Sequence, residues 1–384
     1  MATGKIKKIQ RPRTKKIKIL QLLGYSSGAS GVWQRCKDES LEFMKRGYEV
    51  MVMSSDLIKG SDEKAKHFEV IEGLPVKRYK SRKIGGESFM QWDYISALND
   101  AHDYEPDIVI AHNFRHTHAK FALKLKETFG CKAYVVTHAP FKRKRKLLAS
   151  IAVALQNETT KIAQFDRIIP ICKWEMSDLK KLGGGIPNQK IKRIPNAIGA
   201  RYFTNDTKPG DGILFLGRLH PVKDIRTLTN GLNASKRYNK ATIVGDGDDS
   251  YKADMDFWER AQRIVLLKKG PVYDVEKKIQ IIDDHEIFVL PSLMEAMPIS
   301  LIEAMARGKI VVATRTEGAK ELIKDEVNGF LVDIGDSEEM GDIFDRIYEM
   351  PEEKKQKIRE AARESAKEYK MEKIMERWES VFNK

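Results

Sequence analysis

Cysteines and long apolar runs are scarce in this sequence. Only three cysteines occur among 384 residues, at Cys36, Cys131 and Cys172, and none belongs to a Cys-x-x-Cys pair. We therefore expect free thiols in a reducing compartment, without a disulfide framework or structural zinc. No apolar run approaches the roughly 20 residues of a membrane-spanning helix. The basic first residues lack the apolar segment of a secretory signal, so a cytoplasmic location is expected.

Several common catalytic signatures are also missing. The sequence has no Gly-x-x-x-x-Gly-Lys-Ser/Thr, no Gly-x-Ser-x-Gly and no His-Glu-x-x-His. P-loop, α/β-hydrolase and zincin activities therefore lack support. His112, His116 and His118 form a small cluster, but no cysteine or second histidine pair completes four zinc ligands at a familiar spacing. A cleft-lining role, or none, is favoured for these histidines, and no metal site is predicted.

What the sequence does contain is a regular alternation of strand-like and helix-like segments. Hydrophobic residues make up 41% and charged residues 32%, as in ordinary globular proteins, and 384 residues are too many for one core. Several strand-like segments are apolar throughout, as strands covered on both faces must be. An α/β fold with parallel sheets follows. The expected strands are Ile17–Leu23, Val50–Ser54, Asp107–Ala111, Ala133–Thr137, Arg167–Ile171, Gly212–Leu216, Ala241–Val244, Ile264–Leu267, Ile287–Leu290, Ile310–Ala313 and Phe330–Val332.

Loop-forming residues divide the chain into two halves. Proline and glycine punctuate the stretch that begins at Ile191 and runs through the polar residues up to Asp211. We predict a basic tail over residues 1–15, a first domain over 16–195 and a second over 196–365. Residues 366–384 read as a charged helix, with Trp378 and Phe382 as anchors, that packs back on the first domain.

Glu295 and Glu303 are the most informative residues of the second half. Glu295 follows the apolar strand 287–290, and Glu303 lies inside a helical pattern closed by Gly308. The carboxyl ends of strands in open α/β sheets border the ligand crevice, and a helix N-terminus offers free N–H groups to an anion. Phosphates and sugar hydroxyls would suit such a pocket. One alternative stays open: Ser300 and Glu303 also fit a capping box, unless the helix begins earlier, near Pro298.

A second pair of candidates follows the first strand of the second half. Arg218 comes directly after Gly217, and Lys223 is five residues further on. A guanidinium can grip a diphosphate with two hydrogen bonds, and a lysine adds a compact positive charge. Two exposed bases on a loop are the simpler interpretation of these residues alone. Together with the two carboxylates, they favour a phosphate-binding site.

The first half offers a small-residue loop and a histidine. The loop over residues 28–33 follows the first strand and leads into a helix, and its small residues would let a phosphate or sugar approach the backbone. His138 ends a strand, at the sheet edge where ligands bind. A structural histidine is the equally weighted alternative.

Taken in order, these segments resemble the retaining GT-B glycosyltransferases of family 4. The resemblance extends over about residues 16–335 and is strongest in the last third. Each segment alone is moderately specific, whereas the ordered set is highly specific. The matching stretches are Ser30-Gly31, 46–50, Thr137-His138, 194–196, 217–223, 244–247, 270–272, 288–292, the pair Glu295 and Glu303 with seven residues between them, 304–308, Glu321 and Asn328-Gly329.

The resemblance implies a fold, a reaction and a set of roles. The fold would be GT-B, with two Rossmann-like, doubly wound parallel-sheet domains facing across a cleft. The reaction would be sugar transfer from a nucleotide-sugar donor with retention of anomeric configuration, without a cofactor or metal. The implied catalytic residues are His138, Arg218, Lys223 and Glu295. The implied donor-binding residues are Gly31, Asn196, Gly217, Arg218, Lys223, Val272, Glu295, Ala296, Met297, Pro298, Ile299 and Glu303.

The sequence also departs from the family pattern. Asp224 replaces the glycine usual after the lysine, and Ser30 replaces the first glycine of the usual Gly-Gly loop. Ala197 and His285 stand where a glycine and a small apolar residue are usual. Ala296 replaces a glycine beside the donor sugar and leaves less space there, so the identity of the donor stays open.

The acceptor and the partners are less defined. Net charge is +14, with clusters over residues 1–18 and 142–146 that would attract an anionic polymer or lipid, unless they are solvated surface. Residues 142–155 read as a basic, then apolar, helix that could rest on an anionic membrane or pack as a core helix. The acceptor could be a glycan, a lipid-linked molecule or an anionic polymer. Nucleic acid is not favoured, because no stacking-aromatic motif or recognition helix accompanies the charge.

Two alternative functions share the same architecture. A sugar-nucleotide-binding protein would keep the pocket and lack transfer, although the intact Arg218, Lys223, Glu295 and Glu303 speak against it. A sugar-nucleotide epimerase would act on the donor without an acceptor.

Overall fold

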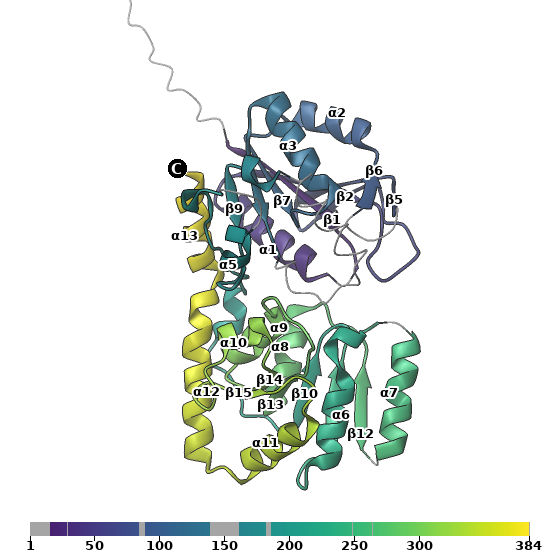
Figure 1. The fold of residues 1–384 in the computed structure, drawn as a ribbon, viewed down its shortest axis with the longest axis vertical. Coiled ribbons are helices and arrows are strands. Elements are labelled where there is room, and N and C mark those ends of the chain that lie inside the picture. Colours follow the sequence, from purple (N-terminus) through teal and green to yellow (C-terminus); the bar gives the residue numbers. More distant parts are fainter. Residues whose placement is uncertain are drawn as a thin grey trace, which may run out of the picture.

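The computed structural model describes residues 16–28, 30–83, 89–138, 161–181, 186–247, 249–262 and 264–383. Two α/β units lie one above the other along the long axis of the molecule, joined on one side by the last helices (Figure 1). Both basic clusters of the sequence, at residues 1–18 and 142–146, lie outside the described residues, apart from Lys16 and Lys18. The same holds for the expected membrane-contacting segment 142–155.

The first unit is built on one seven-stranded sheet. Its strand order is β3-β4-β2-β1-β7-β8-β9, parallel throughout except for β3, which pairs antiparallel with β4. A two-stranded ribbon, β5-β6, lies beside it. The strands are β1 (Lys18–Tyr25), β2 (Glu49–Ser55), β3 (Phe68–Ile71), β4 (Leu74–Tyr79), β5 (Ser81–Lys83), β6 (Met90–Trp92), β7 (Ile108–His112), β8 (Lys132–Val136) and β9 (Arg167–Ile169). The helices are α1 (Gly31–Lys45), α2 (Tyr94–Tyr104), α3 (Thr117–Phe129) and α5 (Glu175–Lys181), with short 3-10 turns at Ile162–Gln164, Asn188–Lys190 and Ala200–Phe203.

The second unit is built on a fully parallel six-stranded sheet of order β12-β11-β10-β13-β14-β15. Its strands are β10 (Ile213–Leu216), β11 (Lys240–Val244), β12 (Val265–Lys269), β13 (Ile287–Leu290), β14 (Ile310–Thr314) and β15 (Phe330–Val332). Its helices are α6 (Ile225–Ala234), α7 (Asp249–Gln262), α8 (Val275–Asp283), α9 (Ile299–Ala306), α10 (Glu317–Leu322), α11 (Ser337–Glu349) and α12 (Glu352–Ala366). After 3-10 turns at Pro221–Lys223 and Lys367–Tyr369, the last helix is α13 (Met371–Phe382).

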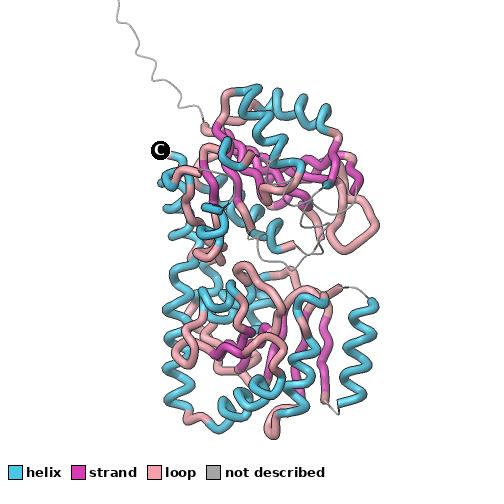
Figure 2. The backbone as a smooth tube through the Cα atoms, in the orientation of Figure 1, coloured by secondary structure: helices cyan, strands magenta, loops and turns pink. Residues whose placement is uncertain are grey.

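The α/β fold predicted from the sequence is confirmed, and each of the eleven expected strands corresponds to a strand of the structure. Figure 2 shows the strands gathered in the middle of each unit, with helices outside them. Strands β13 and β14 are fully buried, because helices cover both faces of the second sheet. The four strands β3 to β6 were not predicted.

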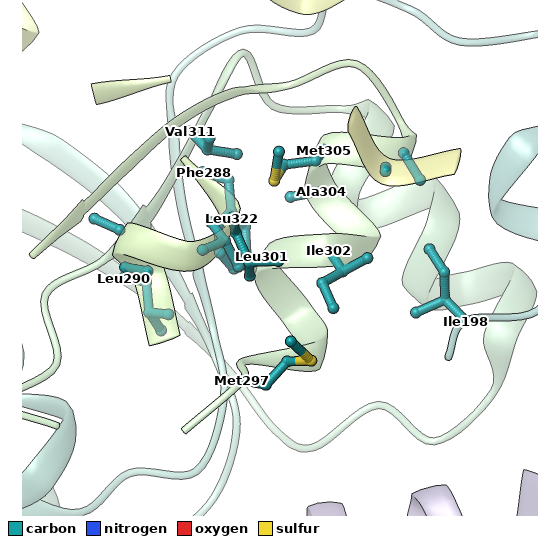
Figure 3. Packing of buried hydrophobic residues seen from close by; sticks show 14 of the residues in the cluster. Ile198, Phe288, Leu290, Met297, Leu301, Ile302, Ala304, Met305, Val311 and Leu322 are labelled. Carbon is teal, nitrogen blue, oxygen red and sulfur yellow. The ribbon is translucent and has the colours of Figure 1, made fainter. Parts of the chain in front are cut away.

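Helix α9 is almost entirely buried in the core of the second unit. Its residues 301–306 are all buried, and Figure 3 shows Leu301 and Met305 packed among Phe288, Val311 and Leu322. Burying such side chains contributes about 1.5–3 kcal/mol each relative to exposure. The helix is therefore held rigidly beneath the loop that carries Glu295.

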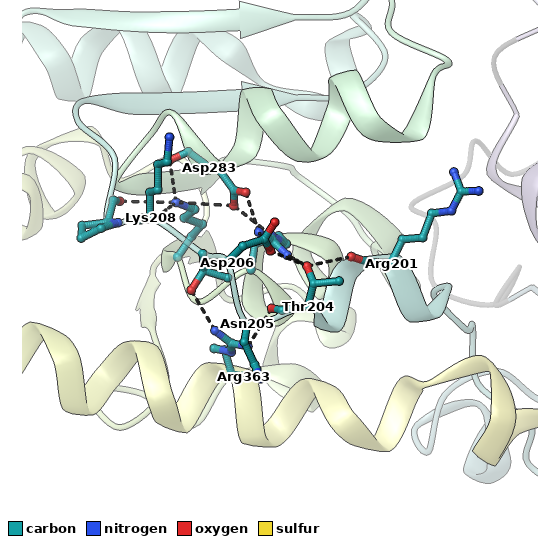
Figure 4. A network of polar contacts seen from close by, with 11 residues as sticks. Arg201, Thr204, Asn205, Asp206, Lys208, Asp283 and Arg363 are labelled. Carbon is teal, nitrogen blue, oxygen red and sulfur yellow. Dashed lines mark hydrogen bonds and ion pairs between the residues drawn. The ribbon is translucent and has the colours of Figure 1, made fainter.

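The connector between the units is held by a buried arginine of the second unit. The guanidinium of Arg307 is fully buried and donates hydrogen bonds to Asp283 and to Thr204 in the connector. Arg363 on α12 donates to Thr207 at 2.8 Å and to the carbonyl oxygen of Thr204 at 3.1 Å. Figure 4 shows this network between the connector and α12. Such charged hydrogen bonds fix the connector where it leaves the first unit.

The last helix crosses to the first unit. Residue 370 forms a bridge with Ile198, and α13 then packs on α1. The indole of Trp378 is fully buried and donates to Glu39 at 3.0 Å, and its ring meets those of Phe43 and Phe382 at 5.8 and 5.5 Å. The α12–α13 pair thus spans both units (Figure 1).

Candidate functional site

Each sheet has one point at which the strand order reverses. In the second sheet this point lies between β10 and β13, and in the first between β1 and β7. Open α/β sheets bind ligands at such points, beyond the carboxyl ends of the strands. The loops that follow β10 and β13 carry Arg218, Lys223 and Glu295, and the loop after β1 leads to Gly31 at the start of α1. The topology therefore brings most of the predicted residues to two crevices.

Lys223 and Glu295 meet in the crevice of the second unit. The ammonium of Lys223 donates to the Glu295 carboxylate at 2.6 Å, with both side chains largely buried, and the Ser292 hydroxyl donates to the same oxygen at 2.7 Å. The two loops are also joined by a backbone hydrogen bond from Leu293 to Val222, at 2.9 Å. One cation and one carboxylate are thus fixed side by side, although the sequence separates them by more than seventy residues.

Arg218 is exposed at the same strand end. Gly217 before it is held by a hydrogen bond from its N–H to the carbonyl oxygen of Val244 at 3.0 Å. The neighbouring loop approaches so closely that a Cβ at Gly245 would lie 1.9 Å from the oxygen of Gly217. Only glycine at residue 245 permits this packing. Arg218 therefore extends from a tightly fixed backbone, and within the described part of the chain it has no ion-pair partner.

Glu303 does not cap its helix. Helix α9 begins at Ile299, with Pro298 as N-cap, so the capping box with Ser300 does not form and the earlier start is confirmed. The Glu303 carboxylate is instead buried and accepts a hydrogen bond from Lys278 on α8 at 2.9 Å, with the Tyr202 hydroxyl close by. Neither contact was predicted, since no sequence spacing relates α8 or the connector to α9.

Asp38 on α1 faces this cluster from the first unit. Its pKa is raised to about 6, chiefly by burial and also by the nearby Glu303, against the opposing effects of Gln34, Lys37 and Lys278. The two units therefore approach each other at α1 and α9. Figure 1 shows α1 on the side of the first unit that faces the second.

The loop of residues 295–299 is fixed from two sides. The N–H of Gly318 donates to the Glu295 carbonyl at 3.1 Å, and a Cβ at Gly318 would lie 2.5 Å from the carbonyl oxygen of Ala296. From the first unit, the Cys172 thiol donates to that same oxygen at 2.8 Å. The first N–H groups of α9 follow, without a side-chain cap. Free N–H groups at a helix start favour an anion.

Asn196 and Met297 join the two units to each other. The Asn196 amide donates to the Met297 carbonyl at 2.8 Å and accepts from Arg35 on α1 at 3.1 Å. Both residues are buried. These hydrogen bonds join the two units, and the donor-binding roles that the resemblance implied for both residues stay predictions.

Gly31 lies in the first unit and Val272 in the second. Gly31 is the first residue of α1, after the N-cap Ser30, and a Cβ there would meet nothing within 4 Å. Val272 lies half-buried between β12 and α8, packed against the core. Space at Gly31 is thus available to a ligand, while the protein itself does not need it.

His138, which is partly buried, lies at the end of a row of polar side chains. Its Nε2 lies 2.9 Å from Nδ1 of His112, whose Nε2 lies 2.9 Å from Oε1 of Gln21. Burial lowers the pKa of both histidines well below the usual value. His116 and His118 are held neutral in the same way, with the pKa lowered to about 4 and about 3. The neutral cluster carries no charge with which to balance an anion.

A cavity of about 550 Å³ lies elsewhere, between the connector and α12. Several charged groups that line it are already paired: Arg359 with Glu286, Arg363 with the connector, and Lys367 with Glu364. The paired groups indicate a structural junction, and the crevice at β10 and β13 remains the candidate site.

In the described part of the chain, no helix is long and apolar enough to span a membrane, and no three ligands gather in a way that could hold a metal ion. The three cysteines are free, as predicted, and the structure shows that all three are buried.

Comparison with known proteins gives a consistent result for both units. The family model Glycosyltransferase Family 4 matches residues 29–200, and Glycosyl transferases group 1 matches residues 204–365. A relative, the Escherichia coli UDP-Gal:alpha-D-GlcNAc-diphosphoundecaprenol alpha-1,3-galactosyltransferase, is 29% identical over 171 residues, which are 38% of this chain and 42% of that protein. The match thus spans less than half of the relative.

Two solved structures extend the likeness to the whole fold. Sucrose-phosphate synthase from Thermosynechococcus elongatus has a TM-score of 0.79 at 14% identity, covering 96% of this chain and 98% of that one. Anabaena HepE in complex with UDP-glucose has a TM-score of 0.75 at 18% identity, covering 96% and 100%. The matched family models and this shared architecture confirm the resemblance seen in the sequence: the chain belongs to the GT-B glycosyltransferases of group 1.

Proposed function

We propose that this protein transfers a sugar from a nucleotide-sugar donor to an acceptor hydroxyl, with retention of anomeric configuration. The observation that carries the proposal is the joining of Lys223 and Glu295 at 2.6 Å, beside Arg218 and before the free N-terminus of α9. Cations, a carboxylate and helix N–H groups then border one crevice. HepE, which shares the fold, was solved with UDP-glucose, and this supports a sugar nucleotide as ligand.

The geometry suits departure of a nucleoside diphosphate. Breaking the anomeric C–O bond leaves negative charge on the diphosphate, and fixed positive groups stabilise charge where it develops. Arg218 would bind the diphosphate, and Lys223 would approach it while Glu295 faces the sugar. The backbone N–H groups at the start of α9 add the positive end of the helix dipole. In this proposal the cations supply what a metal ion supplies in other transferases.

Retention would follow from attack on the face from which the diphosphate leaves. The acceptor hydroxyl approaches the anomeric carbon beside the departing phosphate, which takes its proton. No nucleophile of the enzyme is required in this scheme. Glu303 would bind the ribose, Val272 the base, and Gly31 and His138 the transferred sugar from across the cleft.

The first unit would select the acceptor. The galactosyltransferase relative is named for a diphosphate-linked lipid acceptor. An anionic or lipid-linked acceptor would fit the basic clusters of this sequence, and action beside the inner face of a membrane, in the cytoplasm, is proposed on the same grounds. A liposome flotation assay with and without anionic lipid tests that location.

The function is tested in two steps. Thermal shift against nucleoside diphosphates and their sugars first identifies the donor, because a ligand at 100 times its Kd stabilises the native state by about 2.7 kcal/mol. Transfer to candidate acceptors is then followed by NMR, which also reports the anomeric configuration of the product. Inversion would refute the retaining mechanism. Binding without hydrolysis or transfer would favour a binding protein, and a changed donor sugar without acceptor would favour an epimerase.

A further inference from the structure

Three neighbouring strands of the first unit place their polar side chains in one buried line. Gln21 lies on β1, His112 ends β7 and His138 follows β8, and these strands are adjacent in the sheet. The side chains of Gln21 and His112 are completely buried. The contacts from Gln21 to His112 and from His112 to His138 are both 2.9 Å. The line thus leads from the sheet interior to its carboxyl edge, at the strand-order reversal.

Two residues at this edge of the sheet have a left-handed backbone conformation. His138 has φ of 53° and Asn113, directly after His112, has φ of 71°, both left-handed. The N–H of Asn113 donates to the carbonyl of Val136 at 2.8 Å, which ties the two strand ends together. Left-handed backbone is unfavourable for residues that carry a Cβ. The bend puts the His138 ring 5.2 Å from that of His112, centre to centre.

The amide oxygen of Gln21 determines where the protons lie. Both imidazoles are neutral, since burial and the neighbouring Arg35 and His118 disfavour their charged forms. A neutral imidazole has one N–H and one acceptor nitrogen. Because the Gln21 oxygen only accepts, His112 carries its proton on Nε2, and its Nδ1 must accept from Nε2–H of His138. The unprotonated nitrogen of His138 is then Nδ1.

We propose that Gln21 and His112 are positioning residues that fix His138 as its Nε2–H tautomer, so that Nδ1 accepts a hydrogen bond from a hydroxyl of the bound sugar or acceptor. The consequence for transfer rests on the proposed function. The tautomer itself is a property of the free protein. A histidine held by a second group in this way is oriented before substrate arrives.

Two substitutions of His112 separate its two contacts. The amide of asparagine reaches about as far as imidazole Nδ1, so His112→Asn retains a partner for His138. The amide of glutamine reaches about as far as Nε2, so His112→Gln retains only the contact with Gln21. We expect His112→Gln and Gln21→Leu to lower kcat about 10–100-fold, the loss typical when an orienting partner is removed. The KM of the donor should change little, and His112→Asn should recover most of the activity.

A buried control tests for a merely structural effect. Val135→Ala on β8 removes buried apolar groups next to the line without touching it. It should lower Tm as much as the histidine variants, because a cavity in the core lowers stability. Its kcat should stay within about twofold of wild type, because the proton positions on His112 and His138 are unchanged. An equal loss of kcat in Val135→Ala and His112→Gln would overturn the proposal.

The tautomer is measured directly on ligand-free protein. In protein labelled with ¹⁵N-histidine, the long-range ¹H–¹⁵N correlation pattern of His138, assigned by its loss in His138→Gln, should be that of an Nε2–H imidazole. Gln21→Leu should give a mixture of tautomers. An Nδ1–H pattern in the wild type, or an unchanged pattern in Gln21→Leu, would overturn the proposal. The expected pattern in a protein that transfers no sugar would refute the proposed function alone.

Discussion

Lys223 and Arg218 are the residues from which the proposed chemistry is easiest to test. Both would stabilise charge on the leaving diphosphate, one while bonded to Glu295 and the other from an exposed position. We expect Arg218→Ala and Lys223→Ala each to lower kcat by about 10²–10³, as removal of one stabilising donor does. If these cations act in place of a metal, as proposed, EDTA should leave the wild-type rate unchanged. Initial rates of transfer at saturating donor measure both effects.

A nearby arginine provides the matched control. Arg226 is also exposed and lies on the first turn of α6, three residues after Lys223. Arg226→Ala should retain the wild-type rate. Near-normal turnover in both site variants, or inactivation by EDTA that a divalent cation reverses, would refute the assignment.

Glu303 should recognise ribose through the carboxylate that Lys278 and Tyr202 hold in place. A hydrogen bond to a charged group contributes about 1.5–3 kcal/mol, so the wild type should bind a nucleoside diphosphate about 10–100-fold more tightly than its 2′,3′-dideoxy analogue. Glu303→Gln should remove most of this preference and change the affinity for the dideoxy analogue little. Calorimetric titrations of both proteins with both ligands close the double-mutant cycle.

A glutamate at the surface serves as the control for that cycle. Glu276 is exposed on α8 and pairs with the exposed Arg201. Glu276→Gln should keep the full preference for ribose. If Glu303→Gln kept it as well, Glu303 would be a structural partner of Lys278, without a role in binding.

Residues of the candidate site could be predicted from the sequence only where the local pattern indicates a strand end or a helix start. Arg218, Lys223, Glu295 and Glu303 each follow a strand or enter a helix in a recognisable local pattern. Their partners lie far away in sequence: the contacts of Tyr202 and Lys278 with Glu303, and of Gln21 with His112, arise from packing between elements. The same limit explains Asn196 and Met297, whose mutual contact across the units is invisible in either local segment.

At the scale of elements, a substitution at the start of α1 can show whether the absence of a side chain there is needed by the fold or by a ligand. In Gly31→Ala the new Cβ has no atom within 4 Å, and the backbone at residue 31 is not left-handed. The Tm of this variant should therefore stay at or above that of the wild type. If a phosphate or sugar approaches there, kcat/KM should still fall, since one methyl group in a binding pocket changes the rate about 10–200-fold. Thermal unfolding and steady-state kinetics on the same preparation test this.

Gly245→Ala should behave in the opposite way. Its Cβ would lie 1.9 Å from the Gly217 carbonyl oxygen, so the loop after β10 must shift. Both Tm and activity should therefore fall. If Gly31→Ala left kcat/KM unchanged, the start of α1 would lie away from the ligand.

Elements were predictable where periodicity and burial were strong. The missed strands β3 and β4 form a hairpin whose turn, Glu72-Gly73, has both φ angles positive, at 53° and 87°. A two-residue turn of this kind joins antiparallel strands. Strand β3 is largely exposed, so its sequence lacks the alternation of apolar and polar residues that marks a half-buried strand. The β5-β6 ribbon consists of two three-residue strands, too short for a period to appear.

At the scale of the whole molecule, the approach of the two units should depend on pH through Asp38. Burial raises its pKa from 3.8 to about 6, so between these values the native state holds a proton that the unfolded chain releases. Stability from this group is therefore present at pH 4 and is lost as pH rises through 6. Asp38→Asn, which keeps a partner for Gln34, should gain on the order of 1–3 kcal/mol at pH 7.

The gain of Asp38→Asn should vanish near pH 4, where the native aspartate is neutral. Urea unfolding of the two proteins from pH 4 to pH 7 measures the difference. A gain that is constant over this range would mean that the charge of Asp38 has no part in the effect. The exposed carboxylate of Glu72, paired with Lys37 outside this contact, offers the control, and Glu72→Gln should give no pH-dependent gain.

The α12–α13 pair should decide whether the two units unfold together. Helix α12 packs on the second unit and α13 on the first, where Trp378 is buried against Phe43 and bonded to Glu39. Trp378→Ala should cost about 3–5 kcal/mol, as large-to-small changes of buried tryptophan do. Because the lost contacts are those that hold α13, calorimetry should resolve two transitions instead of one, and proteases should cut near residues 367–370.

Two further variants serve as controls for that experiment. Trp378→Phe keeps ring packing and loses only the bond to Glu39, so it should destabilise less and keep one transition. Trp258 packs on Tyr251 within the second unit, and Trp258→Ala should lower stability there without exposing residues 367–370 to proteases. If Trp378→Ala unfolded in a single transition and resisted cleavage, the units would be coupled through the Asn196–Met297 contact and the crevice itself, and a donor bound there should then restore the Tm lost in this variant.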